Sequence, residues 1–380
     1  MKNKYFNNAG CGIMSEKTIS LMVNHFNLES QFGGYVAAKE MSPYLNQFYS
    51  LSAKLLNAKD GHEIAFIDSA SRGWNMVMYG LPLTENNTII TLSSEYGTNL
   101  LTIYDIVFKN KCRLKIIDCD DKGHFIMSDL EDALHSPNPI LAISHVAAQG
   151  SIINPIVEIG KLAKNYGAYY IVDGCQAVGQ IDVDVQEIGC DAYITAGRKW
   201  LRGPRGTGIL YVRSGGVIRT PQIDLASADL VFDSTNSVIG IKIRDDAKQF
   251  ELWERSIASV IGLTNAISEC LEIGLSSISE QVLIKSQMIR DCILSNSKFT
   301  YVGDPNSPCG ISSFYVNDKG IEEYVKTLFE KNNYSISLMC DWDCPLFFPK
   351  NGTNYIYRIS PHYYTSMEDI NCLCDLISKI

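Results

Sequence analysis

The segment DAYITAGRKWLRGPRGTGILYVR, residues 191–213, places one lysine, Lys199, between an apolar strand and a turn rich in glycine and arginine. An amine attacks a carbonyl only when it is deprotonated, and a lysine loses its proton most readily when it is desolvated or crowded by other cations. Arg198, Arg202 and Arg205 are expected to supply that crowding. The segment therefore predicts a lysine that forms a Schiff base, and the alternative is a solvated basic loop.

A carboxylate at the end of another apolar run strengthens this interpretation. The run YYIVDGCQAVG, residues 169–179, predicts a buried parallel strand that ends at Asp173, and Gln176 follows it. Ligands of open α/β sheets bind beyond the carboxyl ends of the strands, where Asp173 and Lys199 would both lie. Asp173 alone could equally cap a helix or form a turn. Beside a lysine it suits pyridoxal phosphate (PLP), which needs a carboxylate to keep its ring nitrogen protonated and an amine to hold its aldehyde.

Together with SHV at residues 144–146 and RISPHYY at residues 358–364, these residues resemble the class V aminotransferase family of PLP enzymes over essentially the whole chain. Within that family, GRKWLRGPRGTG, ASRGWNMVMYGLP and FELWERS are most similar to the hercynylcysteine sulfoxide lyases and their relatives in sulfur and natural-product metabolism. The resemblance implies fold type I, an α/β fold with a large domain around a mostly parallel seven-stranded sheet and a smaller C-terminal α/β domain. It also implies a homodimer.

The order of apolar runs agrees with such a fold. Strands are predicted at Glu63–Asp68, Thr88–Ser94, Arg113–Asp118, Ile140–Val146, Tyr169–Asp173, Asp191–Thr195 and Gly208–Val212. Helical patterns separate most of them, which indicates a parallel sheet with helices on both faces. Further on, helices are predicted at Ala247–Gly274, Glu280–Ser295, Ile321–Asn332 and Met367–Ile380, with strands near Gly310–Val316, Tyr334–Met339 and Tyr355–Ser360. We therefore predict a large cofactor-binding domain over residues 15–246 and a small domain from residues 1–14 and 247–380.

Composition favours an enzyme that acts on a small molecule. The 380 residues carry a formal net charge of -9, which opposes nonspecific binding to nucleic acid or to anionic membranes. The start MKNKYFNNAGCG has no apolar signal region and no stretch is long enough to span a bilayer, so a cytoplasmic protein is expected. The twelve cysteines form no CxxC pair and are expected to be reduced and mostly buried, and the six histidines show no metal-binding spacing.

The resemblance places the cofactor phosphate at the start of a helix that follows the first strand. Ser69, Ala70 and Ser71 lead into this helix, so backbone N–H groups, the helix dipole and the Ser71 hydroxyl can meet an anion there. Arg198 would add positive charge from the other side. Without a ligand, the same small residues would simply cap the helix.

Three further residues match cofactor contacts of the family. Tyr96, in SSEYGTN, follows a strand and opens a helix where the family stacks a ring on the cofactor, although a half-buried core tyrosine would look the same. Gln176 is expected to hydrogen-bond the cofactor's phenolic oxygen. His145 lies at a strand end near that oxygen in the family, and the alternative is a histidine that the backbone satisfies.

The substrate is expected to be an amino acid held by its carboxylate. Arg358, in YIYRISP, matches the family's carboxylate-binding arginine, whose fork of donors can bind a carboxylate in bidentate fashion. The alternative is a surface arginine. Asn8, in NNAG, lies where the family's N-terminal segment covers the substrate. Ala148 departs from the asparagine that desulfurases have at this position, and Gln149 could replace that contact.

Whether the enzyme takes up the substrate's sulfur atom depends on a nucleophilic cysteine of its own. Desulfurases attack the substrate sulfur with a thiolate on a mobile loop, and Cys340 and Cys344 lie in the corresponding region without the family's loop motif. Asp341 and Asp343 would raise the pKa of a nearby thiol, which argues against an activated nucleophile. We therefore expect a lyase in which Lys199 removes the α-proton and a β-substituent leaves, cleaving a carbon–sulfur bond. Cysteine desulfuration, transamination, epimerisation and decarboxylation remain open alternatives.

Overall fold

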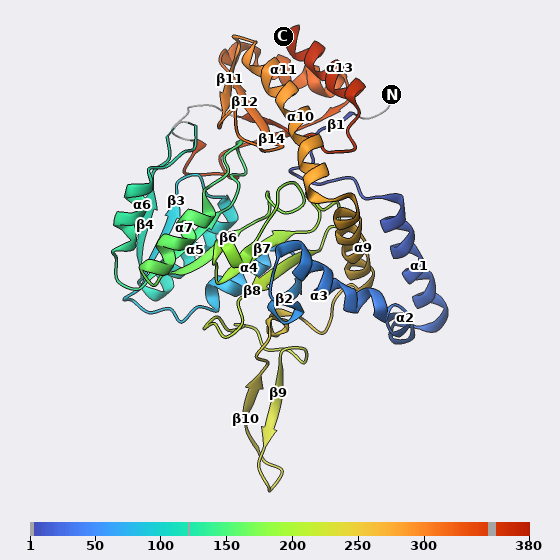
Figure 1. Cartoon of the computed structure of the whole chain (residues 1–380), viewed down its shortest axis with the longest axis vertical. Helices are drawn as coiled ribbons and strands as arrows, with labels where there is room; N and C mark the ends of the chain where they lie inside the picture. The colour runs from blue at the N-terminus through green and yellow to red at the C-terminus, as the bar shows by residue number, and fades with distance from the viewer. Residues whose placement is uncertain (1–3, 121, 349–354) are drawn as a thin grey trace.

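The computed structural model describes residues 4–120, 122–348 and 355–380 and places them in a broad body topped by a smaller α/β unit (Figure 1). The body is built around a seven-stranded sheet in the order β2-β8-β7-β6-β5-β3-β4. Its strands are β2 (Ile64–Ile67), β3 (Thr88–Leu92), β4 (Arg113–Ile117), β5 (Pro139–Ser144), β6 (Tyr169–Asp173), β7 (Ala192–Ala196) and β8 (Gly208–Val212). Each strand predicted for the large domain is present.

The strand directions confirm the prediction of a mostly parallel sheet. Neighbouring pairs among β4, β3, β5, β6 and β7 are parallel, and β8 runs antiparallel to both β7 and β2. As a result, β2, β3, β5, β6 and β7 all end at the same edge of the sheet. Nearly every residue of these strands is buried, as expected for a parallel sheet that is covered on both faces.

Helices cover both faces of this sheet because successive strand residues point to opposite sides. Ile171 and Ile194 pack on the face that carries α4 (Ala70–Tyr79) and α5 (Gly97–Asn110). Val172 and Tyr193 pack on the opposite face, which carries α3 (Ser42–Leu56), α6 (Met127–Leu134), α7 (Ile156–Asn165) and the short α8 (Val185–Ile188). The sheet therefore separates two apolar cores, and its polar strand ends are left at the edge.

Helix α9 (Ile257–Ile273) lies beside α3 and the N-terminal α1 (Glu16–Phe32), which is followed by α2 (Gly34–Glu40). Its Val260, Leu263 and Ile267 belong to the same core as α3 and the sheet. The division of the chain at residue 247 stays a prediction.

None of the described helices is by itself long and apolar enough to cross a membrane. Helices α9 and α10 (Leu275–Leu294) meet the length and composition test only as a pair, and they are bent by 83° relative to each other.

The smaller unit has a four-stranded antiparallel sheet in the order β11-β12-β15-β14. Its elements are β11 (Phe299–Val302), β12 (Ser312–Val316), β14 (Ser337–Met339) and β15 (Ile356–Ile359), with α10, α11 (Lys319–Lys331) and α13 (Met367–Ser378). The N-terminal β1 (Lys4–Tyr5) pairs with β13 (Tyr334–Ser335), and an isolated bridge joins Asn7 to Ser360. Residues 4–7 are thus held beside the last strands.

One predicted helix was too long. The segment predicted as a helix over Ala247–Gly274 begins as a short 3-10 turn, η2 (Ala247–Phe250), and α9 starts only at Ile257. Between them the chain is irregular and is tied to β2, because the Glu251 carboxylate accepts the Phe66 N–H at 2.8 Å. Another 3-10 turn, η1 (Gly61–Glu63), precedes β2. Helical periodicity alone did not reveal this tertiary contact.

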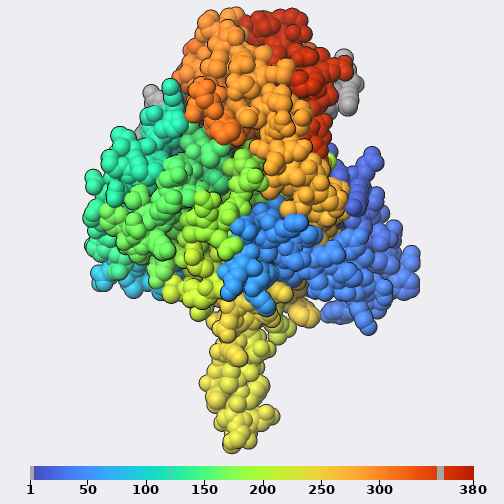
Figure 2. All heavy atoms as spheres, in the orientation of Figure 1, coloured from blue at the N-terminus to red at the C-terminus, as the bar shows by residue number. Residues whose placement is uncertain are grey.

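Three strand regions had no counterpart in the prediction. They are the two-residue β1, β11 and a hairpin of β9 (Ala228–Phe232) and β10 (Val238–Ile243) that projects from the body as a narrow stalk (Figures 1 and 2). In the hairpin turn, the Asp233 carboxylate accepts the N–H groups of Thr235 and Ser237 at 2.8 and 2.9 Å, and Asn236 adopts a left-handed φ of 65°. The hairpin is stabilised by its own turn, and its apolar side chains are exposed. Its sequence therefore lacks the pattern of buried residues by which the other strands were predicted.

Candidate active site

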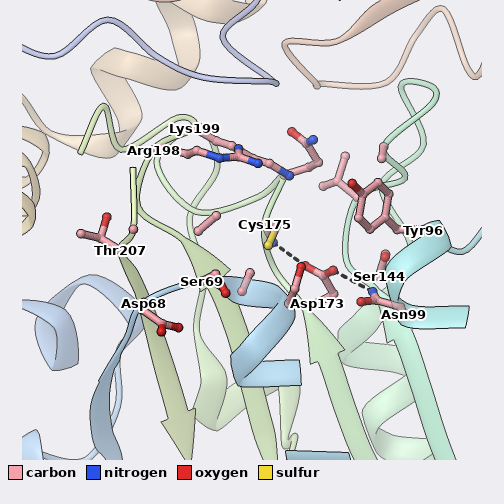
Figure 3. A pocket seen from close by; sticks show the side chains of 17 residues that line it. Asp68, Ser69, Tyr96, Asn99, Ser144, Asp173, Cys175, Arg198, Lys199 and Thr207 are labelled. Atoms are coloured by element: carbon pink, nitrogen blue, oxygen red, sulfur yellow. Dashed lines mark hydrogen bonds between the residues drawn. The ribbon is translucent and has the colours of Figure 1, made fainter. Parts of the chain in front are cut away.

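A single pocket at the carboxyl edge of the large sheet collects most of the predicted cofactor residues (Figure 3). It is bounded by the ends of β5, β6 and β7 and by the N-termini of α4 and α5. The predicted residues that line it are Ser69, Ala70, Ser71, Tyr96, Asp173, Gln176, Arg198 and Lys199. The polar residues that line it without having been predicted are Asp68, Asn99, Ser144, Cys175 and Thr207.

Lys199 follows β7 in a tight turn that the N-terminal segment covers. The Gly12 N–H donates to the Arg198 carbonyl at 2.7 Å, and a Cβ at Gly12 would lie 2.5 Å from the Lys199 carbonyl oxygen. Burial is the largest effect on the Lys199 amine and lowers its pKa, and the nearby Arg198 and Arg358 lower it further. Asp173 opposes this shift. The lysine is thus held in surroundings that favour its neutral, nucleophilic form.

The source of positive charge near Lys199 differs in part from the prediction. Arg198 acts on the lysine as expected, but Arg358 takes the place foreseen for Arg202 and Arg205. Arg202 has a left-handed φ of 61°, and its guanidinium donates to the Ile13 carbonyl and lies 4.4 Å from the centre of the Tyr364 ring. Its charge therefore holds the N-terminal segment in place.

Asp173 is the last residue of β6 and lies at the bottom of the pocket (Figure 3). Its Oδ1 accepts the Cys175 N–H at 2.8 Å, and its Oδ2 accepts the Asn99 side-chain amide at 2.8 Å. Gly174 next to it cannot be replaced without disruption, since a Cβ there would lie 1.9 Å from the Tyr193 ring. The carboxylate is therefore held in one orientation by two donors, with its remaining acceptor capacity directed at the pocket.

The N-terminus of α4 supplies an anion site on the other side of the pocket. The Ser69 side chain caps the helix by accepting the Arg72 N–H at 3.2 Å, and the first helical hydrogen bond runs from the Gly73 N–H to the Ser69 carbonyl at 3.0 Å. The N–H groups of Ala70 and Ser71 precede that bond, so the helix itself does not use them. With the positive end of the helix dipole, they form a place for a phosphate.

Tyr96 and Gln176 line the same pocket in different ways. Tyr96 immediately precedes α5 and lies above Asn99 at one side of the pocket (Figure 3). Gln176 already has two partners: its oxygen accepts the Trp200 indole N–H at 3.0 Å, and its nitrogen donates to the Ala9 carbonyl at 3.0 Å. One N–H of the Gln176 amide remains for a ligand.

His145 and Asn8 do not line the pocket. The Nδ1 of His145 lies 2.7 Å from the Tyr193 hydroxyl, and burial lowers the pKa of this histidine to about 3, so it is neutral. Asn8 donates to the Ser360 carbonyl at 2.7 Å and accepts from the Tyr364 hydroxyl. The structure thus gives both side chains partners within the protein, and their predicted ligand contacts stay predictions.

Arg358 lies just behind the pocket wall on β15. Its Nη1 donates to the carbonyl of Ala148, which itself lines the pocket, at 2.8 Å. Its Nε has no hydrogen-bond partner, and no carboxylate forms an ion pair with it, in the part of the chain that the structure describes. A buried guanidinium without a counter-charge is energetically costly, and such a group is expected where a carboxylate ligand binds.

Two polar residues behind Asp173 were missed from the sequence. Asn99 links the Asp173 carboxylate to Glu95, whose side chain is almost completely buried. Burial, followed by the charge of Asp173, raises the pKa of Glu95 to about 7. The only signal was the spacing in SSEYGTN, where Glu95 and Asn99 are four residues apart across a helix start; Tyr96 alone was singled out there.

The cysteines in the loop before β15 are not activated. Cys344 is buried and its thiol donates to the Gln149 side-chain oxygen at 3.3 Å, and burial and Asp343 raise its pKa. Partial burial and Asp343 also raise the pKa of Cys340. The loop packs against the start of α5, where the Gly97 N–H donates to the Asp343 carbonyl at 2.7 Å. The expected influence of the aspartate charge on both thiols is therefore confirmed, and all twelve cysteines are free, seven of them buried.

The chemistry of these groups fits PLP. Lys199 would hold the aldehyde, Asp173 the ring nitrogen and the N-terminus of α4 the phosphate. Each of these groups lines the same pocket, and an amine, a carboxylate and an anion site are the three kinds of partner that the aldehyde, ring nitrogen and phosphate of the cofactor require. Among the described residues, no cluster of three or more His, Cys, Asp and Glu is placed to hold a metal ion.

Known proteins agree with this assignment. The Aminotransferase class-V family model matches residues 5–373. A probable cysteine desulfurase of Methanothermobacter thermautotrophicus is 25% identical over 359 residues, covering 93% of this chain and 88% of the relative. A probable cysteine desulfurase of Pyrococcus abyssi is 25% identical over 393 residues, covering 99% of this chain and 94% of the relative.

Solved structures share the fold. The apo cysteine desulfurase from Thermococcus onnurineus matches with a TM-score of 0.86 at 23% identity, covering 99% of this chain and 94% of that one. A cystine C–S lyase in complex with cysteine persulfide matches with a TM-score of 0.87 at 18% identity, covering 100% and 98% of the two chains. With the family match extending over residues 5–373, the chain belongs to the class V aminotransferase family and is a PLP-dependent enzyme of fold type I.

Proposed function

We propose that this enzyme breaks the carbon–sulfur bond of cysteine or of a cysteine-derived amino acid, and that cysteine desulfuration is the first candidate. The observation that carries the proposal is a pair of buried cations: Lys199 lines the pocket and has a lowered pKa, and Arg358 lies behind the pocket wall with no ion pair to any carboxylate among the described residues. Curated relatives that carry the name probable cysteine desulfurase support cysteine as the substrate and desulfuration as the reaction.

The roles of the residues follow from their positions. When bound, PLP withdraws electrons from the substrate's α-carbon. Arg358 would bind the substrate carboxylate, with Nε as a donor that has no partner among the described residues. Lys199, released from the cofactor, would take the α-proton, because burial lowers the pKa of its amine and so favours the neutral form. Asp173, fixed by Cys175 and Asn99, would hold the proton of the ring nitrogen.

A second candidate, β-elimination, is favoured by the state of the thiols. A desulfurase needs a thiolate that can reach the substrate sulfur, whereas Cys344 is buried, hydrogen-bonded to Gln149 and has a raised pKa. Cys340 is more accessible, but its pKa is raised as well. In an elimination, neither thiol would be needed, since the sulfur departs with the leaving group. Desulfuration would require the 340–344 loop to leave its contact with α5.

A product screen separates these reactions. The purified protein with PLP is incubated with cysteine, cysteine conjugates and their sulfoxides, and alanine, pyruvate, ammonia and sulfide are measured. Alanine together with protein-bound sulfur supports desulfuration. Pyruvate and ammonia in equal amounts support elimination. Turnover without cleavage of the carbon–sulfur bond, as in transamination, epimerisation or decarboxylation, would contradict the proposal.

We also propose that the enzyme acts as a homodimer. Two exposed apolar regions support this: the β9–β10 hairpin and the solvent-facing side of α1 and α2. The exposed side chains are Leu230, Phe232, Val238, Ile239 and Ile241 on the hairpin and Val23, Phe26, Phe32, Tyr35 and Val36 on the helices. Apolar patches of this extent usually mark interfaces. Light scattering coupled to size-exclusion chromatography tests the assembly, and a mass of about 42 kDa in solution would contradict it.

A further inference from the structure

Behind Asp173 lies a second carboxylate that the reaction described above does not use. Glu95 is 1% exposed and accepts hydrogen bonds from several donors at once. Its Oε1 accepts the Tyr96 N–H at 2.9 Å, the Asn99 amide at 2.9 Å and the Ser144 hydroxyl, and its Oε2 accepts the Ser144 N–H at 2.8 Å. A buried carboxylate with perturbed surroundings beside a pocket is a candidate for a role in that site.

The topology of the sheet brings these groups together. Glu95 follows β3, Ser144 ends β5 and Asp173 ends β6, and these strands are direct neighbours in the sheet. Ser144 and Asp173 are paired in register. The network therefore spans the carboxyl edge of three adjacent strands, and its members Asn99, Ser144 and Asp173 line the pocket (Figure 3).

Asn99 is the link between the two carboxylates. Its Nδ2 carries two hydrogens, and it donates to Glu95 Oε1 at 2.9 Å and to Asp173 Oδ2 at 2.8 Å. An asparagine amide that faced the carboxylates with its oxygen would be repelled by both. Glu95 thus fixes which end of the Asn99 amide faces Asp173, and it prevents the amide from turning away.

From this geometry we propose that Glu95 is a positioning residue that acts through Asn99 to hold the Asp173 carboxylate against the ring nitrogen of PLP. The proposal rests on PLP binding and does not depend on which substrate bond is broken. Two consequences follow for Asp173. The hydrogen bond from Asn99 keeps Oδ2 of Asp173 in one orientation. Behind Asp173 lies the carboxyl group of Glu95 rather than an apolar side chain. Both effects favour a protonated ring nitrogen.

The test uses the affinity of the apoprotein for two ligands. One ligand is PLP, and the other is the analogue in which a ring C–H replaces the nitrogen, so that it cannot interact with Asp173 in this way. Equilibrium dialysis gives both dissociation constants for the wild type and for Glu95→Gln and Asn99→Ala. Each variant should weaken PLP binding by about tenfold or more, since it disturbs a hydrogen bond to a charged group, and should leave analogue binding within about threefold.

A matched control is Glu63→Gln. Glu63 is also a buried glutamate, and it accepts the backbone N–H groups of Lys59 and Ser214 at 3.0 Å each. It lies at the opposite end of β2 from the pocket, so Glu63→Gln should leave the ratio of the two affinities unchanged. Thermal unfolding of each apoprotein checks that the variants are folded. Ser144→Ala, which removes only one donor to Glu95, serves if the other variants do not fold, and it should shift the same ratio by about threefold.

Two results would overturn the inference. One is equal weakening of PLP and analogue, which would mean that the network only supports the shape of the pocket. The other is an unchanged ratio in every folded variant. A wild-type protein that fails to bind PLP at all would instead contradict the cofactor assignment, so the two failures can be told apart.

Discussion

Replacing Asp173 with asparagine separates the electrostatic role of this residue from its structural one. The asparagine can keep an oxygen toward the Cys175 N–H, which lies 2.8 Å from Oδ1. Its NH₂ group then faces the Asn99 NH₂ group across the 2.8 Å contact at Oδ2, so a donor meets a donor. The lost hydrogen bond should cost about 2 kcal/mol of folding free energy. A neutral amide also cannot hold a proton on the ring nitrogen, which should lower kcat by about a hundredfold or more, or about 3 kcal/mol of transition-state stabilisation.

Asp191→Asn is the matched control. Asp191 is a partly buried aspartate at the opposite edge of the sheet, where it accepts the Tyr170 N–H at 2.8 Å and lies 3.7 Å from Arg213. The Asp191→Asn variant should lose a comparable amount of folding free energy, but its kcat should stay near the wild-type value. Thermal unfolding, cofactor content and product formation from cysteine are measured for both variants. A near-normal kcat in Asp173→Asn, with cofactor bound, would show that another group supports the ring nitrogen.

Further predictions concern the lysine, the cysteines and the buried glutamate. The purified holoenzyme should be yellow, and borohydride reduction should leave a pyridoxyl group on Lys199 in the mass spectrum; an adduct on another lysine would refute its role. If the reaction is an elimination, alanine at both Cys340 and Cys344 should leave kcat/KM within about tenfold, whereas loss of sulfur release in a single variant that remains folded and yellow would establish desulfuration. Arg358→Ala should raise KM in either case. The pKa of Glu95 rises to about 7 from the ordinary 4.5, so the folded apoprotein binds this proton more tightly than the unfolded chain does. The free energy of unfolding of the wild type, compared with that of Glu95→Gln, should therefore fall by about 3 kcal/mol as the pH rises from 4.5 to 7. Urea titrations at several pH values measure this.

The parts of the site that were predictable are those adjacent to strand ends. Asp173 and Lys199 each follow an apolar run, and a parallel sheet brings such ends to one edge whatever the loops do. The helix start at Ser69 was visible for the same reason, because small residues directly follow a strand. These positions depend on local pattern and on a general rule of topology, and both can be read without knowledge of side-chain contacts.

What was missed depends on contacts between distant segments. The role of Glu95 depends on its proximity to Ser144 and Asp173. These residues lie on neighbouring strands but are 49 and 78 positions away in the chain. Arg202 seemed well placed to crowd the lysine, but its left-handed backbone directs the guanidinium over Tyr364. Charge patterns along the sequence do not show which way a side chain turns, and only the packed structure resolves it.

The attachment of the first residues to the last strands has a consequence for how the protein is made. Lys4 pairs with Tyr334 and the Asn8 side chain binds the Ser360 carbonyl, so the segment that covers Lys199 is anchored to parts of the chain synthesised more than 300 residues later. A growing polypeptide can form its central sheet long before those partners leave the ribosome. The contacts of Lys4 and Asn8 can therefore form only late in synthesis, whereas the contacts of Gly12 with Arg198 and of Ala9 with Gln176 need only the large sheet. The anchoring of the segment that covers Lys199 is thus completed only after the last strand has been made.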